Sequence, residues 1–280
     1  MARFALFLLA ALLAACAAPS APQADENDRP MRIVSLDYCA DQYVLKLVDR
    51  EQILALSPDA EKSFSYMRAA AAGLPRLRPV AEDVVLARPD LVVRSYGGGP
   101  NAAAFFERAG VPVLQVGWAS NVDGEGIGSI PALIEHMADG LGHGDRGAAL
   151  IEDYRARLAA LASRGSNDTA LYLTPGGVTT GPGSLVHEML IAAGLRNFQT
   201  DPGWRSLPLE RLVYETPDRV AAAFFEDFPD NPKTWSASRH PVARALLDGP
   251  AVTPLQGAWT ACGGWFVLDA IEAMAAGGEE

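Results

Sequence analysis

A twelve-residue pattern that occurs twice constrains the fold of this chain more than any other feature of its sequence. Residues 82–93 read EDVVLARPDLVV, and residues 210–221 read ERLVYETPDRVA. The copies align without gaps and share five residues: Glu82/Glu210, Val85/Val213, Pro89/Pro217, Asp90/Asp218 and Val92/Val220. Each copy combines apolar residues at helical spacing, a Pro-Asp stop and a β-rich run, which predicts a short helix followed by a strand.

The distance between the copies indicates how the chain is divided. They begin at residues 82 and 210, 128 residues apart, which is too long for a solenoid repeat and about the length of a small α/β domain. We therefore expect two similar half-molecules, with a cleft between them that binds a small ligand. The alternative is a chance match, because Pro-Asp turns are common.

Strands and helices alternate in both halves, which predicts an α/β fold with central parallel sheets and right-handed crossovers. In the first half the expected elements are strand Met31–Leu36, helix Tyr38–Val48, strand Ile53–Leu56, helix Glu61–Ala72, strand Leu91–Arg94, helix Asn101–Ala109 and strand Val113–Val116. In the second half they are strand Ala170–Leu173, a glycine-rich turn over residues 175–184, helix Leu185–Ala193, helix Leu209–Glu215, strand Arg219–Phe225, helix Pro241–Leu247, strand Ala251–Leu255 and helix Gly264–Ala275.

The pattern changes between the two halves, where no strand is expected. Pro131–Leu141 and Asp145–Ala162 both have helical patterns, and the longer one carries its apolar residues on one stripe. At ~1.5 Å per residue it would extend roughly 27 Å, so we expect a rigid strut between the halves; a surface helix of a single domain is the alternative. The resulting division is an N-terminal lobe over residues 31–128, a helical connector over residues 129–165 and a C-terminal lobe over residues 166–280.

The first residues have the pattern of an export signal. An apolar stretch from Phe4 to Ala15 follows Arg3, and it is too short for a membrane-spanning helix, which needs ~20 apolar residues. We therefore interpret residues 1–15 as a signal peptide. The stretch ends in Leu-Ala-Ala-Cys, which resembles the lipobox of bacterial lipoproteins, and this resemblance implies a lipid anchor on Cys16. The alternative is an ordinary signal cut at Ala-x-Ala. Residues 16–30 are then a flexible tether, rich in Pro, Ala and acidic groups.

Composition limits the partners of the folded part. The chain is 49% hydrophobic and 20% charged, with a formal net charge of −11, which argues against nucleic acid or an anionic membrane surface as partner. Besides Cys16, two cysteines remain, Cys39 and Cys262. An exported protein meets an oxidising compartment, so both a disulfide and two free thiols are compatible with the sequence.

Several segments in order resemble class III periplasmic substrate-binding proteins. They are the lipoprotein signal, the RIVSL strand at residues 32–36, the repeated E-x-V-V-x-x-x-P-D-L-V unit, the GVPV segment at residues 110–113, the long helix and the GPGSL segment at residues 181–185. The resemblance implies two Rossmann-like lobes joined by one rigid helix, with a shallow ligand cleft between them. It implies a periplasmic protein without catalysis or intrinsic cofactor, which delivers a ferric siderophore, haem or cobalamin to a dimeric ABC permease with its ATPase.

The resemblance also assigns roles to two acidic residues. In that family an acidic residue on each lobe pairs with arginines of the permease, and the matching positions here are Glu82 and Glu210. Two carboxylates at equivalent places of similar lobes suit a two-fold partner. The alternative is that each is a favourable acid in the first turn of a helix.

The cargo is expected among aromatic side chains in loops at the carboxyl ends of the strands, where folds of this class bind ligands. The candidates are Tyr38, Tyr96, Trp118, Trp204, Phe228, Trp235 and Trp259. Aromatic walls suit a bulky chelate because they offer a large apolar area with few rotors to freeze. Arg94 and Arg205 are candidates for anionic groups of the cargo, with surface ion pairs as the alternative.

Two other classes are less compatible with the sequence. A receptor for a free metal ion needs clustered histidines and carboxylates, but the four histidines, His136, His143, His187 and His240, are scattered. An enzyme is the other class. The segment Gly181–Ser184 superficially suggests phosphate binding or a nucleophilic serine, as in a hydrolase or transferase, but its order fits neither motif.

Overall fold

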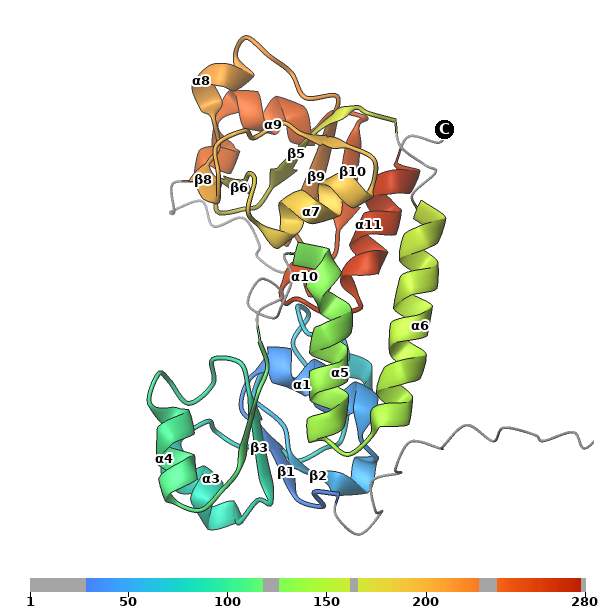
Figure 1. Ribbon diagram of the computed structural model, residues 1–280. Coiled ribbons are helices and arrows are strands. Elements are labelled where there is room, and N and C mark those ends of the chain that lie inside the picture. Colours follow the sequence, from blue (N-terminus) through green and yellow to red (C-terminus); the bar gives the residue numbers. More distant parts are fainter. Residues whose placement is uncertain (1–28, 118–125, 162–165, 227–235, 278–280) are drawn as a thin grey trace, which may run out of the picture.

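The computed structural model describes residues 29–117, 126–161, 166–226 and 236–277. Its two main sheets are parallel, each has four strands, and each belongs to one lobe (Figure 1). The N-terminal sheet has the order β2-β1-β3-β4, with β1 Ile33–Ser35, β2 Ile53–Ala55, β3 Leu91–Arg94 and β4 Val113–Gln115. The C-terminal sheet has the order β10-β9-β5-β7, with β5 Thr169–Leu173, β7 Arg196–Asn197, β9 Arg219–Ala223 and β10 Val252–Leu255.

The two sheets have the same topology. In each, the strand that carries the repeat, β3 or β9, lies between the first and the last strand of its lobe. The registers match as well, because Val92 of β3 pairs with Val34, and Val220 of β9 pairs with Leu171. The expected α/β fold with two lobes and parallel sheets is therefore confirmed.

The Pro-Asp pair of the repeat has a structural role in both lobes. The Asp90 carboxylate accepts a hydrogen bond of 3.1 Å from the backbone N–H of Met31, just ahead of β1. The Asp218 carboxylate accepts bonds of 2.7 Å and 2.6 Å from the backbone N–H and the hydroxyl of Thr169, at the start of β5. Each aspartate thus fixes the beginning of the repeat strand against the beginning of the neighbouring strand.

Helices cover both sheets. The N-terminal lobe contains α1 Tyr38–Leu47, α2 Arg68–Ala71, α3 Ala81–Ala87 and α4 Ala102–Arg108. Two helices follow, α5 Ile130–Gly140 and α6 Gly144–Leu161. The C-terminal lobe contains α7 Leu185–Ala192, α8 Leu209–Leu212, α9 Pro241–Leu247, α10 Gly257–Thr260 and α11 Val267–Ala276. No helix of the described ranges has the length and apolarity needed to cross a membrane.

Three predicted elements differ from the structure. Only Arg68–Ala71 is helical within the helix expected over Glu61–Ala72, because the serines ahead of it favour turns, and the Gln42 side chain accepts the backbone N–H of Met67. Helix α8 is shorter than predicted. The glycine-rich turn contains strand β6 Val178–Thr180, which pairs antiparallel with β8 Trp204–Ser206; three-residue strands carry too little periodicity to predict.

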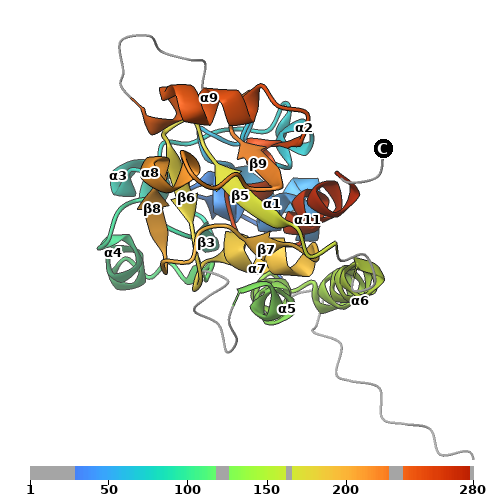
Figure 2. The same cartoon turned by 90° about the horizontal axis from the view of Figure 1, so that it is seen from above.

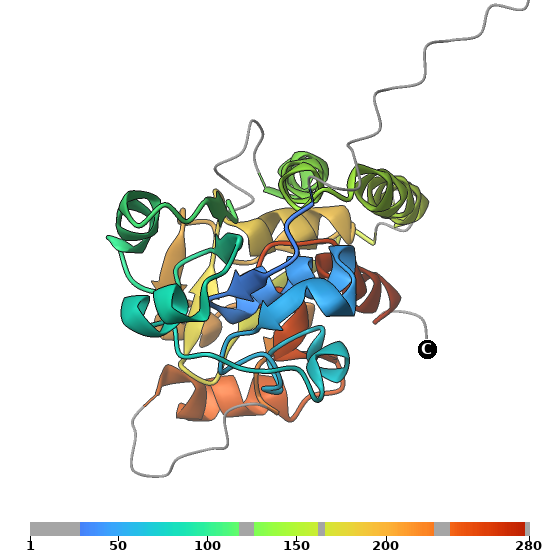
Figure 3. The ribbon, with the colours of Figure 1, turned by 90° about the horizontal axis from the view of Figure 1, so that it is seen from below.

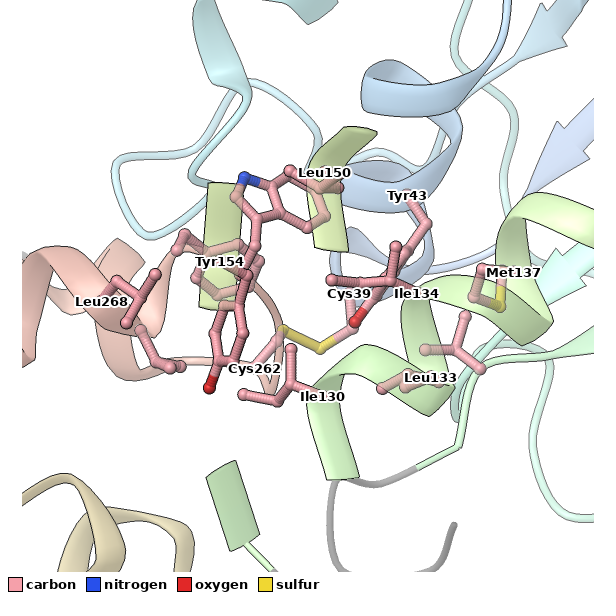
Figure 4. Close-up of a cluster of buried hydrophobic side chains, with 14 of the residues drawn as sticks. Cys39, Tyr43, Ile130, Leu133, Ile134, Met137, Leu150, Tyr154, Cys262 and Leu268 are labelled. Carbon is pink, nitrogen blue, oxygen red and sulfur yellow. A yellow bond between two sulfur atoms is a disulfide. The ribbon is translucent and has the colours of Figure 1, made fainter. Parts of the chain in front are cut away.

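The connection between the lobes is wider than a single helix. Helices α5 and α6 lie side by side along one side of both lobes (Figures 2 and 3). The chain then returns from the C-terminal lobe through α10 and α11, and one continuous apolar core includes side chains of both lobes and of these helices. A disulfide between Cys39 and Cys262, with Cα atoms 5.7 Å apart, lies inside this core among side chains of α5, α6 and α11 (Figure 4). The sequence had left open whether these cysteines pair.

Candidate functional site

The carboxyl ends of the parallel strands lie where the two lobes meet. Helix α1, which follows β1, and helix α10, which follows β10, both lie in the middle of the molecule between the two sheets (Figure 1). Because β1 and β3 are neighbours in the sheet, the loops after them are also neighbours. Tyr38 begins α1 after one of these strands, and Tyr96 lies in the loop after the other, so the fold brings these two predicted residues together.

A buried carboxylate holds these two loops. Asp37 is the N-cap of α1, and its Oδ1 accepts a hydrogen bond of 3.0 Å from the backbone N–H of Ala40. Its Oδ2 accepts three more, of 2.7, 3.0 and 2.8 Å, from the backbone N–H groups of Ser95, Tyr96 and Gly97. Four donors on one carboxylate fix the loop after β3 against the first turn of α1. Asp37 was not among the predicted site residues, although an aspartate just ahead of a helix is an N-cap signal.

Three aromatic rings form a cluster at this point. The ring of Tyr38 meets the ring of Phe64 at 4.9 Å and that of Tyr96 at 6.0 Å, both in edge-to-face geometry. Tyr96 remains 46% exposed. Burial raises the pKa of both tyrosines above the ordinary value, and the neighbouring acids Asp37 and Asp59 raise each pKa further. The two phenols also interact with each other, which lowers the pKa of Tyr38 and raises that of Tyr96. Phe64 was missed because its segment was expected to be a helix.

The loop after β3 also depends on a glycine and an arginine. A Cβ on Gly97 would lie 2.4 Å from the carbonyl oxygen of Leu36, so no other residue fits without a shift of the backbone. Arg94 is buried, and its guanidinium donates to the carbonyl groups of Gly97 and Gly99 and to the Gln115 side chain, at 2.8 to 2.9 Å. Arg94, predicted as a candidate for anionic groups of the cargo or for a surface ion pair, therefore braces the loop through these three hydrogen bonds.

The C-terminal lobe contributes the small sheet of β6 and β8. Trp204 and Arg205 are neighbours on β8, and both are exposed, Trp204 to 58%. The indole ring of Trp204 meets the ring of the buried Tyr172 at 6.3 Å in edge-to-face geometry. Trp259, in α10 between the lobes, is half-buried and packs on the shared core. The remaining aromatic candidates, Trp118, Phe228 and Trp235, lie outside the described residues, as does Cys16.

A separate pocket of about 290 Å³ lies in the C-terminal lobe, between α9 and the ends of β9 and β10. Its polar lining residues are Glu226, Arg244 and Asp248. None of the predicted aromatic site residues lines this pocket.

The two glutamates of the repeat lie at equivalent places. Glu82 is in the first turn of α3 and Glu210 in the first turn of α8, and both are exposed. Helices α3 and α8 lie on the same side of the molecule, away from α6 and α11, in both the front and the top view (Figures 1 and 2).

The histidines and Ser184, which were not expected to bind a metal ion or to catalyse a reaction, make structural contacts. His143 is buried against the Gln52 side chain, and His240 is the N-cap of α9. The Ser184 hydroxyl accepts the backbone N–H of His187 as the N-cap of α7 and donates to the carbonyl oxygen of Gly181. Within the described ranges, no three His, Cys, Asp or Glu side chains are grouped so as to hold a metal ion.

Comparisons with known proteins agree with this architecture. A family model described as "Periplasmic binding protein" matches residues 33–223. In sequence comparison, no curated protein matches the chain.

Solved structures are similar over most of the chain. One is a periplasmic haem-binding protein from Pseudomonas aeruginosa, with 22% identity, 88% of this chain and 92% of that chain covered, and a TM-score of 0.64. Another is a periplasmic haem-binding protein from Roseiflexus sp. RS-1, with 22% identity, coverage of 89% and 99%, and a TM-score of 0.67. A third belongs to an ABC-type Fe3+-hydroxamate transport system from Saccharomonospora viridis, with 21% identity, coverage of 90% and 94%, and a TM-score of 0.66.

Proposed function

The chain belongs to the periplasmic binding protein family, and from that premise we propose that it captures a metal chelate, such as a ferric siderophore or haem, or a cobalamin, and delivers it to an ABC importer. One observation carries this proposal. Two sheets of the same strand order face each other across α1 and α10 (Figure 1); Tyr96 stays exposed in the loop after β3, and the exposed Trp204 lies against Tyr172 of β5. The haem and Fe3+-hydroxamate proteins of similar fold support the choice of cargo class.

The chemistry of these side chains suits a bulky chelate. Tyr38, Tyr96, Trp204 and Trp259 offer flat apolar surfaces, and apolar walls with a few polar groups are typical of small-molecule sites. The phenols of Tyr38 and Tyr96, which interact with each other, are proposed to supply a hydrogen-bond donor for an oxygen atom of the cargo. The exposed guanidinium of Arg205, next to Trp204, is proposed to meet a carboxylate or other anionic substituent.

Delivery requires a partner and a location. As a member of this family the protein works in the periplasm. We assign the contact with the permease dimer, which works with its ATPase, to Glu82 and Glu210, because the two carboxylates occupy equivalent exposed places on the two lobes. The lipid anchor is proposed on Cys16, with residues 17–30 as the tether, because Leu-Ala-Ala-Cys ends the apolar stretch of the signal.

The test is a binding measurement with three probes. The purified protein is titrated with haem, with a ferric hydroxamate siderophore and with cobalamin, while tryptophan fluorescence is recorded and stoichiometry is read by native mass spectrometry. We expect one probe to bind with micromolar or tighter affinity, and the loaded protein to stimulate ATP hydrolysis by the permease–ATPase complex in nanodiscs. Failure of all three probes to bind would overturn the assigned cargo class.

A further inference from the structure

The two most exposed large hydrophobic side chains of the described residues are Leu86, 80% exposed, and Tyr214, 88% exposed. They lie 128 residues apart, which is the separation of the two repeat copies, so they occupy the same position of the repeat. Each follows the glutamate of its copy by four residues. Isolated exposed apolar residues are normal on protein surfaces, but scattered residues would not fall on matching positions of two lobes.

Folding does not require an apolar side chain at this position. The apolar residues that pack inward are two positions earlier in each copy, where Val84 and Leu212 are buried. Leu86 and Tyr214 point away from those cores, and their exposure leaves apolar area in contact with water in the isolated protein. This apolar area contributes favourable free energy only when a partner covers it and removes it from water.

Each exposed apolar residue stands beside an uncompensated carboxylate. Within the described part of the chain, the side chains of Glu82 and Glu210 make no hydrogen bond or ion pair. Their neighbours in sequence are already paired, Asp83 with Arg78 at 2.8 Å and Arg211 with Glu215 at 2.7 Å. Residues four apart on a helical turn have Cβ atoms about 5–6 Å apart, so a carboxylate and an apolar group form one compact contact point on each lobe.

The two contact points belong to helical segments on the same side of the molecule (Figures 1 and 2). Helices α3 and α8 lie on one side of the molecule, opposite α6 and α11 (Figures 1 and 2). Tyr214 lies just after α8, in a turn in which the backbone N–H groups of Tyr214 and Glu215 donate to the carbonyl oxygen of Arg211 at 3.0 and 2.9 Å. A hydrogen-bonded turn thus follows Glu210 as far as Tyr214, whereas helix α3 itself contains both Glu82 and Leu86.

We propose that Leu86 and Tyr214 are paired apolar anchors that dock this protein onto the permease. The partner that fits is a membrane-protein dimer with two-fold symmetry, in which each subunit presents a cationic side chain and, one helical turn away, an apolar hollow. The carboxylates attract and orient the protein, and the apolar anchors slow its dissociation. This inference rests on the proposed function and adds the residues that give the complex its lifetime.

The test compares two pairs of variants in binding to the ABC permease–ATPase complex of the same organism in nanodiscs. We expect Leu86→Ala and Tyr214→Ala each to weaken docking about tenfold, mainly through faster dissociation, as is typical of buried apolar hot spots. The loss should persist at about 1 M salt, where charge interactions are screened within ~3 Å. Glu82→Gln and Glu210→Gln should instead slow association, and this effect should disappear in the same salt.

The controls separate the possible failures. Ile191→Ala removes a side chain that is 49% exposed on α7, outside the repeat, and should leave docking unchanged. Cargo affinity and thermal stability should be the same in all variants. Full docking by the Leu86→Ala/Tyr214→Ala double variant, with weakened glutamate variants, would overturn this inference and leave the proposed function intact. Absence of docking by the wild type would overturn both. Light scattering measures the oligomeric state. If the wild type is a dimer and the double variant is a monomer, the surface serves self-association and the inference is overturned.

Discussion

The disulfide between Cys39 and Cys262 ties the first helix of the N-terminal lobe to the segment between the last two helices of the chain, across 223 residues. Other contacts join the same two segments. The Tyr43 hydroxyl donates to the carbonyl oxygen of Gly263 at 3.0 Å, and the Lys46 ammonium lies 5.9 Å from the ring centre of Trp265. The lobes are therefore linked covalently and by packing where they meet, which favours small movements on binding.

Removal of the disulfide should destabilise the whole protein. A cross-link between residues so far apart restricts the unfolded chain strongly, so we expect the Cys39→Ser/Cys262→Ser variant to lose about 3–5 kcal/mol of unfolding free energy. Urea denaturation of wild type and variant, each with and without reductant, measures this loss. Reductant should lower the urea midpoint of the wild type to that of the variant and leave the midpoint of the variant unchanged. An equal urea midpoint for all four samples would show that the disulfide contributes nothing.

Replacement of Asp37 should loosen the expected ligand loop. Asp37→Ala removes the cap of α1 and leaves three backbone N–H groups of residues 95–97 without their acceptor, so we expect a loss of about 3 kcal/mol and a weaker affinity for cargo. Asp37→Asn keeps one carbonyl acceptor and should lose less unfolding free energy than Asp37→Ala. Hydrogen exchange at Ser95, Tyr96 and Gly97 gives a direct measure; unchanged protection there in Asp37→Ala would contradict the role of this carboxylate.

The buried carboxyl of Asp41 should make stability depend on pH. Burial raises its pKa from 3.8 to about 6, against the opposing effect of hydrogen bonds from Ser35 and from the backbone and hydroxyl of Ser57. Because the folded pKa is above the unfolded one, the stabilising contribution is complete below pH ~4 and is lost as the pH rises through ~6. The loss amounts to about 3 kcal/mol.

The Asp41→Asn variant isolates this contribution from the other titrating groups. Urea denaturation of both proteins from pH 4 to 8 should show the wild type losing stability relative to the variant over this range. A constant difference between the two proteins would mean that the carboxyl titrates equally in the folded and unfolded states.

An ion-pair network between α6 and α11 should contribute to the stability of the connection. The Arg157 guanidinium contacts Glu272 at 2.9 Å through two nitrogens and Asp269 at 2.7 Å, and Asp269 also accepts a bond of 2.7 Å from the hydroxyl of Tyr66. We expect Arg157→Ala to cost about 1–2 kcal/mol, because the contacts are bidentate and partly buried. The matched control is Arg78→Ala, which removes an exposed ion pair with Asp83. This substitution should lower the unfolding free energy by less than about 0.5 kcal/mol. Equal costs in thermal unfolding would reject the special role of the network.

The exposed aromatic residues should determine cargo affinity. Trp204→Ala and Tyr96→Ala should each weaken binding about tenfold, since each removes a large apolar contact. Tyr96→Phe separates the ring from the hydroxyl, and a loss in this variant would identify a hydrogen bond to the cargo. Ile191→Ala serves as the control for an exposed apolar residue outside the candidate site. Unchanged affinity in both alanine variants would place the cargo elsewhere.

Much of the fold could be predicted because it is encoded in short segments. The repeat gave the position of α3 and β3 and of their counterparts in the second lobe, and Pro89-Asp90 marked the boundary between helix and strand. Prediction failed where local signals conflict or are short. Residues 61–67 form turns because Gln42, distant in sequence, takes a backbone N–H of this segment. The strands β6 and β8 have only three residues each.

The sequence by itself determined that the chain is an α/β protein and predicted two similar halves, because helical and strand periodicity and Pro-Asp turns act over a few residues. It also showed that Glu82 and Glu210 occupy matching positions of the two repeat copies. Only the tertiary structure decided that Cys39 meets Cys262, that Asp37 holds the loop of Tyr96, that Arg94 is buried, and that Leu86 and Tyr214 are exposed on one side. These features depend on contacts between residues that are distant in the chain, and such contacts follow from the packing of the lobes and not from sequence spacing.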